Sequence, residues 1–139
     1  MTTTSSGACL CGAVAYIYTG EPVMRAVCYC SPCRKISGGT NTVNFVIPEE
    51  DFTLTRGQPR SFSKEHEYGM TLTVVFCSEC GTTLWKEATA PQFKGVKLVQ
   101  AGTLSDAKKL DEKLDAELYV PERASWLRRL DKAAQKESF

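Results

Sequence analysis

The sequence lacks the residues on which several common enzyme classes depend. His66 is its single histidine, and no serine stands in a Gly-x-Ser-x-Gly nucleophile elbow. A Ser-His-Asp hydrolase therefore has almost no support. A glycine-rich phosphate-binding loop is also missing, because the pair Gly38-Gly39 is too short and is typical of a turn.

An excess of one charge and long apolar runs are missing too. Lys and Arg total 17 against 16 Asp and Glu, which gives a formal net charge of +1. This balance offers no field that would attract nucleic acid or an acidic membrane. No apolar run approaches the ~18 residues that span a bilayer, and the first seven residues carry no secretory signal. We expect a cytoplasmic protein with no nucleic-acid or membrane partner.

The chain of 139 residues is the length of one domain, and it contains no repeat or linker. We expect residues 1–6 to form a flexible N-terminus and residues 7–135 to form the domain. Residues 136–139 are expected to fray.

Short strand-like runs separated by turn residues fill most of the chain. They alternate in polarity or are rich in β-branched and aromatic residues, and they cover residues 13–18, 44–47, 52–55, 71–76, 82–85 and 96–100. This pattern predicts a mainly β fold of packed antiparallel sheets. Four aromatic residues are expected in its core: Phe45, Phe76, Trp85 and Trp126.

The last third of the sequence allows two interpretations. Ser105 could cap a helix in which Leu110, Leu114 and Leu118 share one face. Residues 115–120 fit a strand ended by Pro121 equally well. We favour one short helical turn near Ser105, then an extended segment, then a short helix over residues 121–130.

Seven cysteines are the most informative feature of the composition. The odd number excludes complete disulfide pairing, and clustered cysteines in a reducing compartment more often hold metal. They form a C-x-C, a C-x-C-x-x-C and a C-x-x-C motif, at Cys9 and Cys11, at Cys28, Cys30 and Cys33, and at Cys77 and Cys80.

The spacing suggests a division into four and three. Four thiolates would fill a closed tetrahedral zinc site with a structural role, and they are Cys9, Cys11, Cys77 and Cys80. Iron and disulfides are the alternatives. Gly12 and Gly81, which follow Cys11 and Cys80, fit tight turns around sulfur.

The remaining three cysteines would leave a metal with an open position, which is the pattern of a catalytic zinc site. We therefore treat Cys28, Cys30 and Cys33 as candidate catalytic and metal-binding residues. A redox cluster of free thiols and a site closed by a fourth ligand remain alternatives. His66 could be that ligand or a base, but a surface histidine beside Glu65 and Glu67 is expected more often.

Three ordered motifs carry a resemblance to a known family. GACLCG at residues 7–12, CYCSPCRKISG at 28–38 and FCSECGTTLW at 76–85 resemble the glutathione-dependent formaldehyde-activating enzymes. AGTL at residues 101–104 and the region of Trp126 are similar to the C-terminal part of that family. The resemblance extends from Gly7 to Gln135, with one departure, because Thr73-Val74-Val75 lacks an arginine that many relatives place before the Phe-Cys pair.

The resemblance implies a single zinc-binding catalytic domain with the β-tent fold. It implies two zinc ions, a structural one on Cys9, Cys11, Cys77 and Cys80 and a catalytic one on Cys28, Cys30 and Cys33. The implied activity is that of a carbon–sulfur lyase with glutathione as co-substrate.

The leading hypothesis is a zinc enzyme that makes or breaks a C–S bond to glutathione or a similar thiol. Arg34 and Lys35 could hold a ligand carboxylate. Candidate proton donors are Glu79, Glu87 and His66. The alternatives are a zinc-stabilised binding module without turnover and an adaptor for nucleic acid or the cytoskeleton, which the balanced charge disfavours.

Overall fold

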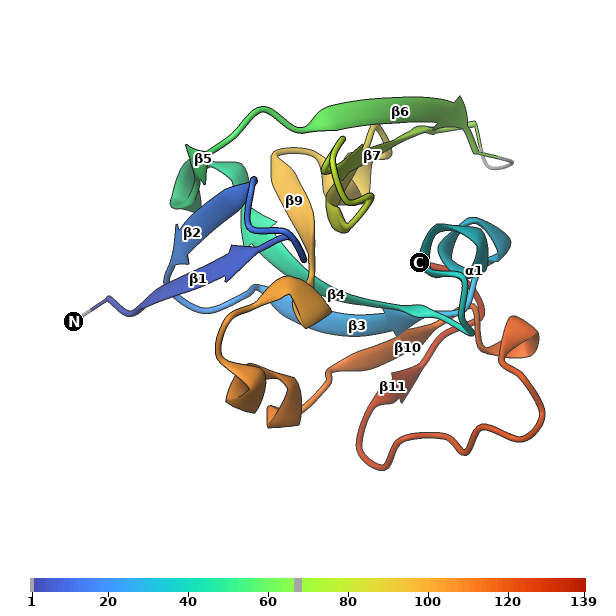
Figure 1. Ribbon diagram of the computed structural model, residues 1–139. Coiled ribbons are helices and arrows are strands. Elements are labelled where there is room, and N and C mark those ends of the chain that lie inside the picture. The colour runs from blue at the N-terminus through green and yellow to red at the C-terminus, as the bar shows by residue number, and fades with distance from the viewer. Residues whose placement is uncertain (1, 67–68) are drawn as a thin grey trace.

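A computed structural model describes residues 2–66 and 69–139, which form two sheets and one helix (Figure 1). The small sheet has the strand order β1-β2-β5 and is antiparallel. Its strands are β1 (Thr4–Ala8), β2 (Ala15–Thr19) and β5 (Phe52–Arg56). None of the helices in the described residues could span a bilayer.

The large sheet has the order β11-β10-β3-β4-β9-β8-β7-β6. Its strands are β3 (Met24–Cys28), β4 (Thr42–Pro48), β6 (Arg60–Glu65), β7 (Thr71–Phe76), β8 (Thr83–Ala88), β9 (Val96–Gln100), β10 (Ala116–Leu118) and β11 (Ala134–Gln135). β10 runs parallel to β3 and β11, and the other pairs are antiparallel. The helix is α1 (Ser31–Ser37), and five 3-10 turns lie at Glu49–Asp51, Pro91–Phe93, Ala101–Thr103, Ala107–Asp111 and Val120–Glu122.

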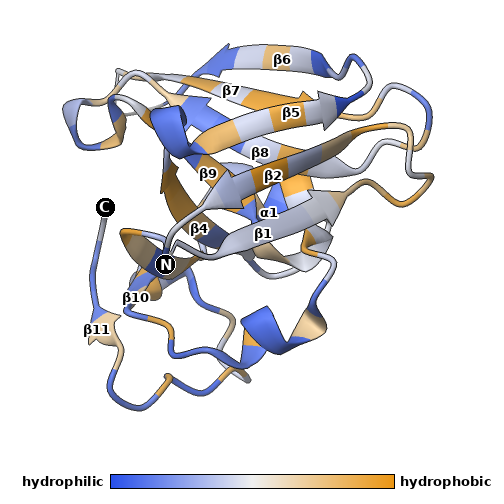
Figure 2. Ribbon diagram, turned by 90° about the vertical axis from the view of Figure 1, so that its left-hand side faces the viewer, coloured by the Kyte–Doolittle hydropathy of each residue, from blue (hydrophilic) through white to orange (hydrophobic). Residues whose placement is uncertain are grey.

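The main core lies between the two sheets. β2 alternates between buried and half-buried residues, which turns Tyr16 and Tyr18 inward. They pack in one cluster with Phe45 and Ile47 of β4, and the Tyr16 ring stacks on Phe52 at 5.2 Å. Figure 2 shows the hydrophobic residues gathered on these central strands, whereas the loops around β10 and β11 are mostly hydrophilic.

The opposite face of the large sheet is buried as well. Because side chains alternate along a strand, Asn44 and Val46 of β4 point away from the main core. α1 and the end of the chain lie over this second face (Figure 1). The face therefore combines apolar and polar buried residues, and it forms the floor of the candidate site.

The predicted mainly β fold is confirmed, and the segment that we expect to be a flexible N-terminus contains β1 over Thr4–Ala8. β1 pairs with β2, and Gly7 lies opposite Tyr16. A side chain at residue 7 would collide with the Tyr16 hydroxyl and with the carbonyl of Thr103. The small residues that suggested a loose segment are thus the ones that fit over the buried tyrosines. β3 and β6 were also not predicted.

The last third of the chain is only partly as predicted. The extended segment is confirmed by β10, and the short helical turn is a 3-10 turn whose cap is Asp106 instead of Ser105. The helix expected over residues 121–130 is wrong, because only Val120–Glu122 forms a 3-10 turn there. Trp126 is 72% exposed and is not in the core.

A buried carboxylate holds this irregular segment. Glu117 of β10 is fully buried, and it accepts hydrogen bonds from Tyr29, Gln135 and the Leu130 backbone and pairs with Arg123 at 3.2 Å. Burial alone would raise the pKa of Glu117, but these hydrogen bonds and the Arg123 charge lower it below its usual range. The segment between β10 and β11 is therefore ordered by one polar centre and not by helix formation.

We predict that Glu117→Gln lowers the free energy of unfolding by about 2 kcal/mol at pH 7, since hydrogen bonds to a charged group are lost. The lowered pKa means that this stabilisation is present above the unfolded-state pKa of about 4.3 and is lost as pH falls through the folded-state value. Urea denaturation across pH 3–8 measures it. The difference in the free energy of unfolding between wild type and variant should be constant above pH 5 and should shrink below pH 4. A difference that does not depend on pH would contradict this assignment.

Candidate metal centres and active site

Four cysteines meet where two turns lie against each other. Cys9 and Cys11 belong to the turn after β1, and Cys77 and Cys80 belong to the turn between β7 and β8. All four sulfurs lie within 4.8 Å of one another, and Cys11 Sγ is 3.7 Å from both Cys9 Sγ and Cys77 Sγ. Four sulfurs around one zinc ion at about 2.3 Å would be about 3.8 Å apart. The cluster, which we call the quartet, therefore has the spacing of a tetrahedral metal site.

The two turns of the quartet are similar, although the second is one residue longer. Gly12 N donates to Cys9 O at 3.1 Å, and Gly81 N donates to Cys77 O at 2.8 Å. Both glycines are left-handed, with φ of 79° and 78°. Other residues rarely adopt this conformation, which explains why a glycine follows the second cysteine of each motif.

Contacts around the quartet favour thiolates at three of its sulfurs. At Cys11, a hydrogen bond from the Ala13 backbone is outweighed by burial and the neighbouring sulfurs, which raise the pKa to about 12. The backbone N–H of Val14 donates to Cys9 Sγ at 3.3 Å, and that of Glu79 donates to Cys77 Sγ at 3.4 Å. Hydrogen bonds from Thr82 lower the pKa of Cys80 to about 5. Because the thiolate is the form that binds metal, these contacts prepare the quartet for a soft cation.

The other three cysteines form a second cluster, which we call the trio. Cys28 ends β3, and Cys30 and Cys33 lie at the start of α1. All three are buried, and their sulfurs lie within 4.8 Å of one another. Within the described residues, no other cysteine, histidine or carboxylate ligand atom joins this group. The trio can thus supply three ligands to a metal ion, which leaves a fourth position open.

The trio has a cationic neighbour that the sequence did not reveal. Lys86 of β8 is only 3% exposed, and its Nζ lies 3.3 Å from Cys33 Sγ and 3.1 Å from Thr42 Oγ1. Hydrogen bonds from the thiols of Cys28 and Cys30, together with Lys86 and Thr42, lower the pKa of Cys33, whereas the pKa of Cys28 is raised because its thiol is the donor. The strand predicted over residues 82–85 stops before Lys86, whereas β8 extends to Ala88 and includes it. The prediction therefore did not place Lys86 on a strand.

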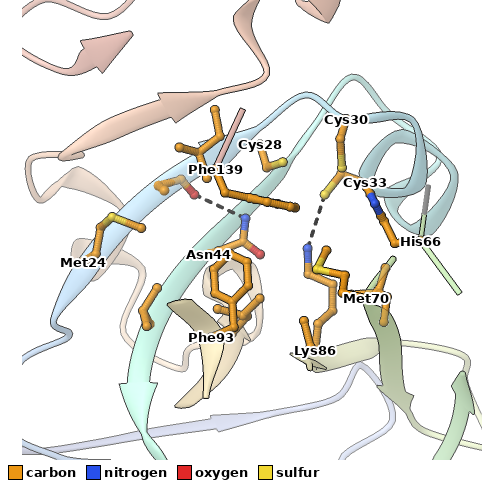
Figure 3. Close-up of a pocket in the computed structure, with 16 residues that line it drawn as sticks. Met24, Cys28, Cys30, Cys33, Asn44, His66, Met70, Lys86, Phe93 and Phe139 are labelled. Atoms are coloured by element: carbon orange, nitrogen blue, oxygen red, sulfur yellow. Dashed lines mark hydrogen bonds between the residues drawn. The ribbon is translucent and has the colours of Figure 1, made fainter. Parts of the chain in front are cut away.

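A small cavity of about 30 Å³ lies beside the trio. Figure 3 shows the three cysteines on one side, Lys86 and Met70 on another, and Phe139 reaching in beside Cys28 and Asn44. Asn44 Nδ2 donates to the Ala26 carbonyl, and its Oδ1 accepts from Gln100. The Lys86 ammonium has three N–H donors, and its acceptors among the described residues are two, Cys33 and Thr42. Its third N–H is therefore available to a ligand.

An open groove of about 590 Å³ adjoins this cavity. One wall is α1 with Lys35 and Ile36, and the other is the β6–β7 hairpin with Phe62 and Lys64. His66 and Leu72 line both the groove and the cavity. The groove and the cavity therefore lie next to each other, with these two residues at their common wall.

Several candidate residues lie elsewhere than the sequence suggested. His66 is not a surface residue but is buried, and its neighbour Glu67 lies outside the described residues. Glu79 is exposed in a quartet turn, and Glu87 is bonded to Trp85 and Lys97, so neither of these carboxylates lines the cavity. Arg34 and Lys35 are exposed on α1, and Lys35 lines the groove.

Comparison with known proteins agrees with this arrangement. The model of a protein family described as glutathione-dependent formaldehyde-activating enzyme matches residues 4–122, which include both cysteine clusters. The chain belongs to this family.

The individual relatives of this member of the formaldehyde-activating enzyme family share low sequence identity with it. A Halomonas elongata protein, provisionally named a glutathione-dependent formaldehyde-activating enzyme, is 32% identical over 83 residues, which are 57% of this chain and 53% of that protein. The chain thus spans about half the length of this curated relative. A crystal structure of a Rhodobacter sphaeroides protein shares 21% identity with a TM-score of 0.58, covering 77% of this chain and 95% of the other, and it supports the fold.

We predict that Cys77→Ala removes one bound metal ion and leaves the protein largely unfolded at room temperature. Binding of a structural zinc ion supplies about 10–16 kcal/mol, whereas a domain is stable by about 5–15 kcal/mol. Metal analysis and thermal unfolding measure both effects. The matched control is Ser78→Ala in the same turn, which removes no ligand. Wild-type metal content and unfolding midpoint in Cys77→Ala would refute a structural metal in the quartet.

Proposed function

We propose that this protein is a zinc-dependent carbon–sulfur lyase. It makes or breaks the C–S bond between glutathione, or a similar thiol, and a small electrophile or metabolite adduct. The observation that supports this most is the convergence of three buried sulfurs and the free N–H of Lys86 on one cavity. Family membership supports the same chemistry.

The two clusters have different proposed roles. Cys9, Cys11, Cys77 and Cys80 hold a structural zinc ion, and Cys28, Cys30 and Cys33 hold a catalytic one. Zinc with three protein ligands keeps a position for substrate, where it would bind the thiol sulfur as thiolate and lower its pKa. Side chains of the protein would bind the rest of the thiol ligand and the electrophile.

Lys86 is placed to act on the electrophile. When a thiolate adds to an aldehyde, negative charge develops on the carbonyl oxygen. The third N–H of Lys86 can donate to this oxygen, because its other two are directed to Cys33 and Thr42. A fixed donor in a site that excludes water stabilises such charge strongly. In the reverse direction, the same donor stabilises the alkoxide from which the C–S bond breaks.

The groove has the chemistry to hold a thiol tripeptide. Glutathione carries two carboxylates, and the groove presents Lys35 and Lys64 on opposite walls. Phe62, which is largely exposed, and Ile36 offer apolar surface to the rest of the ligand. Because the groove shares His66 with the cavity, a thiol held there can extend toward the trio.

We predict that Cys30→Ala removes one of two bound zinc ions and abolishes formation of S-hydroxymethylglutathione above the spontaneous rate. Metal analysis and exchange NMR on glutathione–formaldehyde mixtures measure this. A folded variant with one zinc ion and wild-type turnover would overturn the mechanism. Two zinc ions and bound glutathione without any turnover in the wild type would instead establish the alternative, a non-catalytic zinc-stabilised module that binds a thiol or a protein partner.

We predict that Lys86→Met lowers kcat by about 100-fold to 1,000-fold, which is the usual effect of removing one donor to an oxyanion. The side chain of methionine fills similar space without an N–H donor. Glutathione binding should change less than kcat, since Lys86 lines the cavity and not the groove. Lys97→Met is the control, because Lys97 lies on β9 beside Glu87 and not in the cavity. An unchanged kcat in Lys86→Met would refute the role of Lys86.

A further inference from the structure

The side chain of Phe139 is held against the trio by aromatic residues from three separate parts of the chain. Its ring centroid lies 4.9 Å from that of Tyr119, 5.0 Å from Phe93 and 5.9 Å from His66. The Tyr119 and Phe93 contacts are edge-on, which is a favourable geometry for aromatic pairs. This residue, which we expected to fray, is thus part of the wall of the candidate site.

The backbone before Phe139 is also fixed. Lys136 N donates to Glu117 O at 2.9 Å, and Val120 N donates to Lys136 O at 3.0 Å. These bonds tie the segment to β10, whose Leu118 lines the same cavity. The ring therefore has a defined position beside the three sulfurs, as Figure 3 shows.

With Phe139 in place, the space left beside the trio is about 30 Å³. A cavity needs about 10–15 Å³ on this measure to hold one water molecule. The space thus has room for only two or three atoms in all, so the proposed electrophile has to be small. A larger aldehyde would have to displace the ring.

We propose that Phe139 determines the size of the electrophile by closing the cavity beside the trio. The inference rests on the proposed function for the identity of the occupant, but closure of the cavity can be tested without turnover. The remaining walls are largely apolar, with Met24, Met70 and Leu98 among them. A ligand that replaced the phenyl ring would therefore be an apolar group on the carbonyl carbon.

Phe139→Ala should enlarge the cavity beside the trio by about the volume of a phenyl ring. Apolar protein cavities of about 150 Å³ bind benzene. With glutathione and benzaldehyde, the thiol S–H would add across the C=O bond. The S–C bond forms, the thiol proton goes to the carbonyl oxygen, and no redox partner is needed.

The experiment has one readout with turnover and one without. We expect Phe139→Ala to raise the rate with benzaldehyde, relative to formaldehyde, at least tenfold over the wild type. We also expect toluene to raise the thermal unfolding midpoint of Phe139→Ala and not that of the wild type, since a ligand that binds the folded state stabilises it. Trp126→Ala is the control, because it removes an exposed aromatic side chain far from these contacts.

Phe139→Leu provides a second test if Phe139→Ala does not fold. It keeps an apolar contact and frees less space, so it should accept propanal but not benzaldehyde. Folded variants that neither bind toluene nor accept a larger aldehyde would overturn the inference, and so would a wild type that already accepts benzaldehyde. A wild type inactive with every aldehyde would refute the proposed function, while the toluene result would still decide whether Phe139 closes the cavity.

Discussion

The contact between two cysteine-bearing turns is the constraint on which the rest of the molecule depends. The quartet joins the turn after β1 to the turn between β7 and β8, and 66 residues separate Cys11 from Cys77. β8 starts immediately after this second turn and carries Lys86 to the trio. The cluster that fixes the small sheet against the large one therefore also positions the lysine of the candidate active site.

The two faces of the large sheet have different roles: one packs in the main core, and the other lines the candidate site. Phe45 and Ile47 of β4 pack into the core shared with the small sheet, whereas Asn44, which precedes Phe45, lines the cavity beside the trio. The second face buries polar groups that bond to one another, such as Asn44 with Gln100 and Lys86 with Thr42. Such networks are costly when incomplete, and they hold donors in place around a small cavity.

The sequence predicted the parts of this structure that short-range patterns encode. Cysteine spacing gave the division into quartet and trio, and alternation gave most of the strands. The residues that close the site were missed because tertiary packing decides their burial. His66 has charged neighbours in sequence, and Phe139 follows a polar segment, yet both lie against the trio. Glu117 shows the same effect, since no local pattern reveals that Tyr29, Arg123 and Gln135 converge on it.

In the proposed mechanism, the quartet encloses its metal ion while the trio leaves one coordination position open. Replacing the bound metal with Co²⁺ and recording its visible absorption during a glutathione titration tests this most directly, because cobalt bands report ligand number and type. We expect two cobalt ions per chain, one with a four-sulfur spectrum unaffected by glutathione and one whose spectrum changes until one thiol is bound. A single cobalt ion, or two spectra that glutathione leaves unchanged, would contradict it.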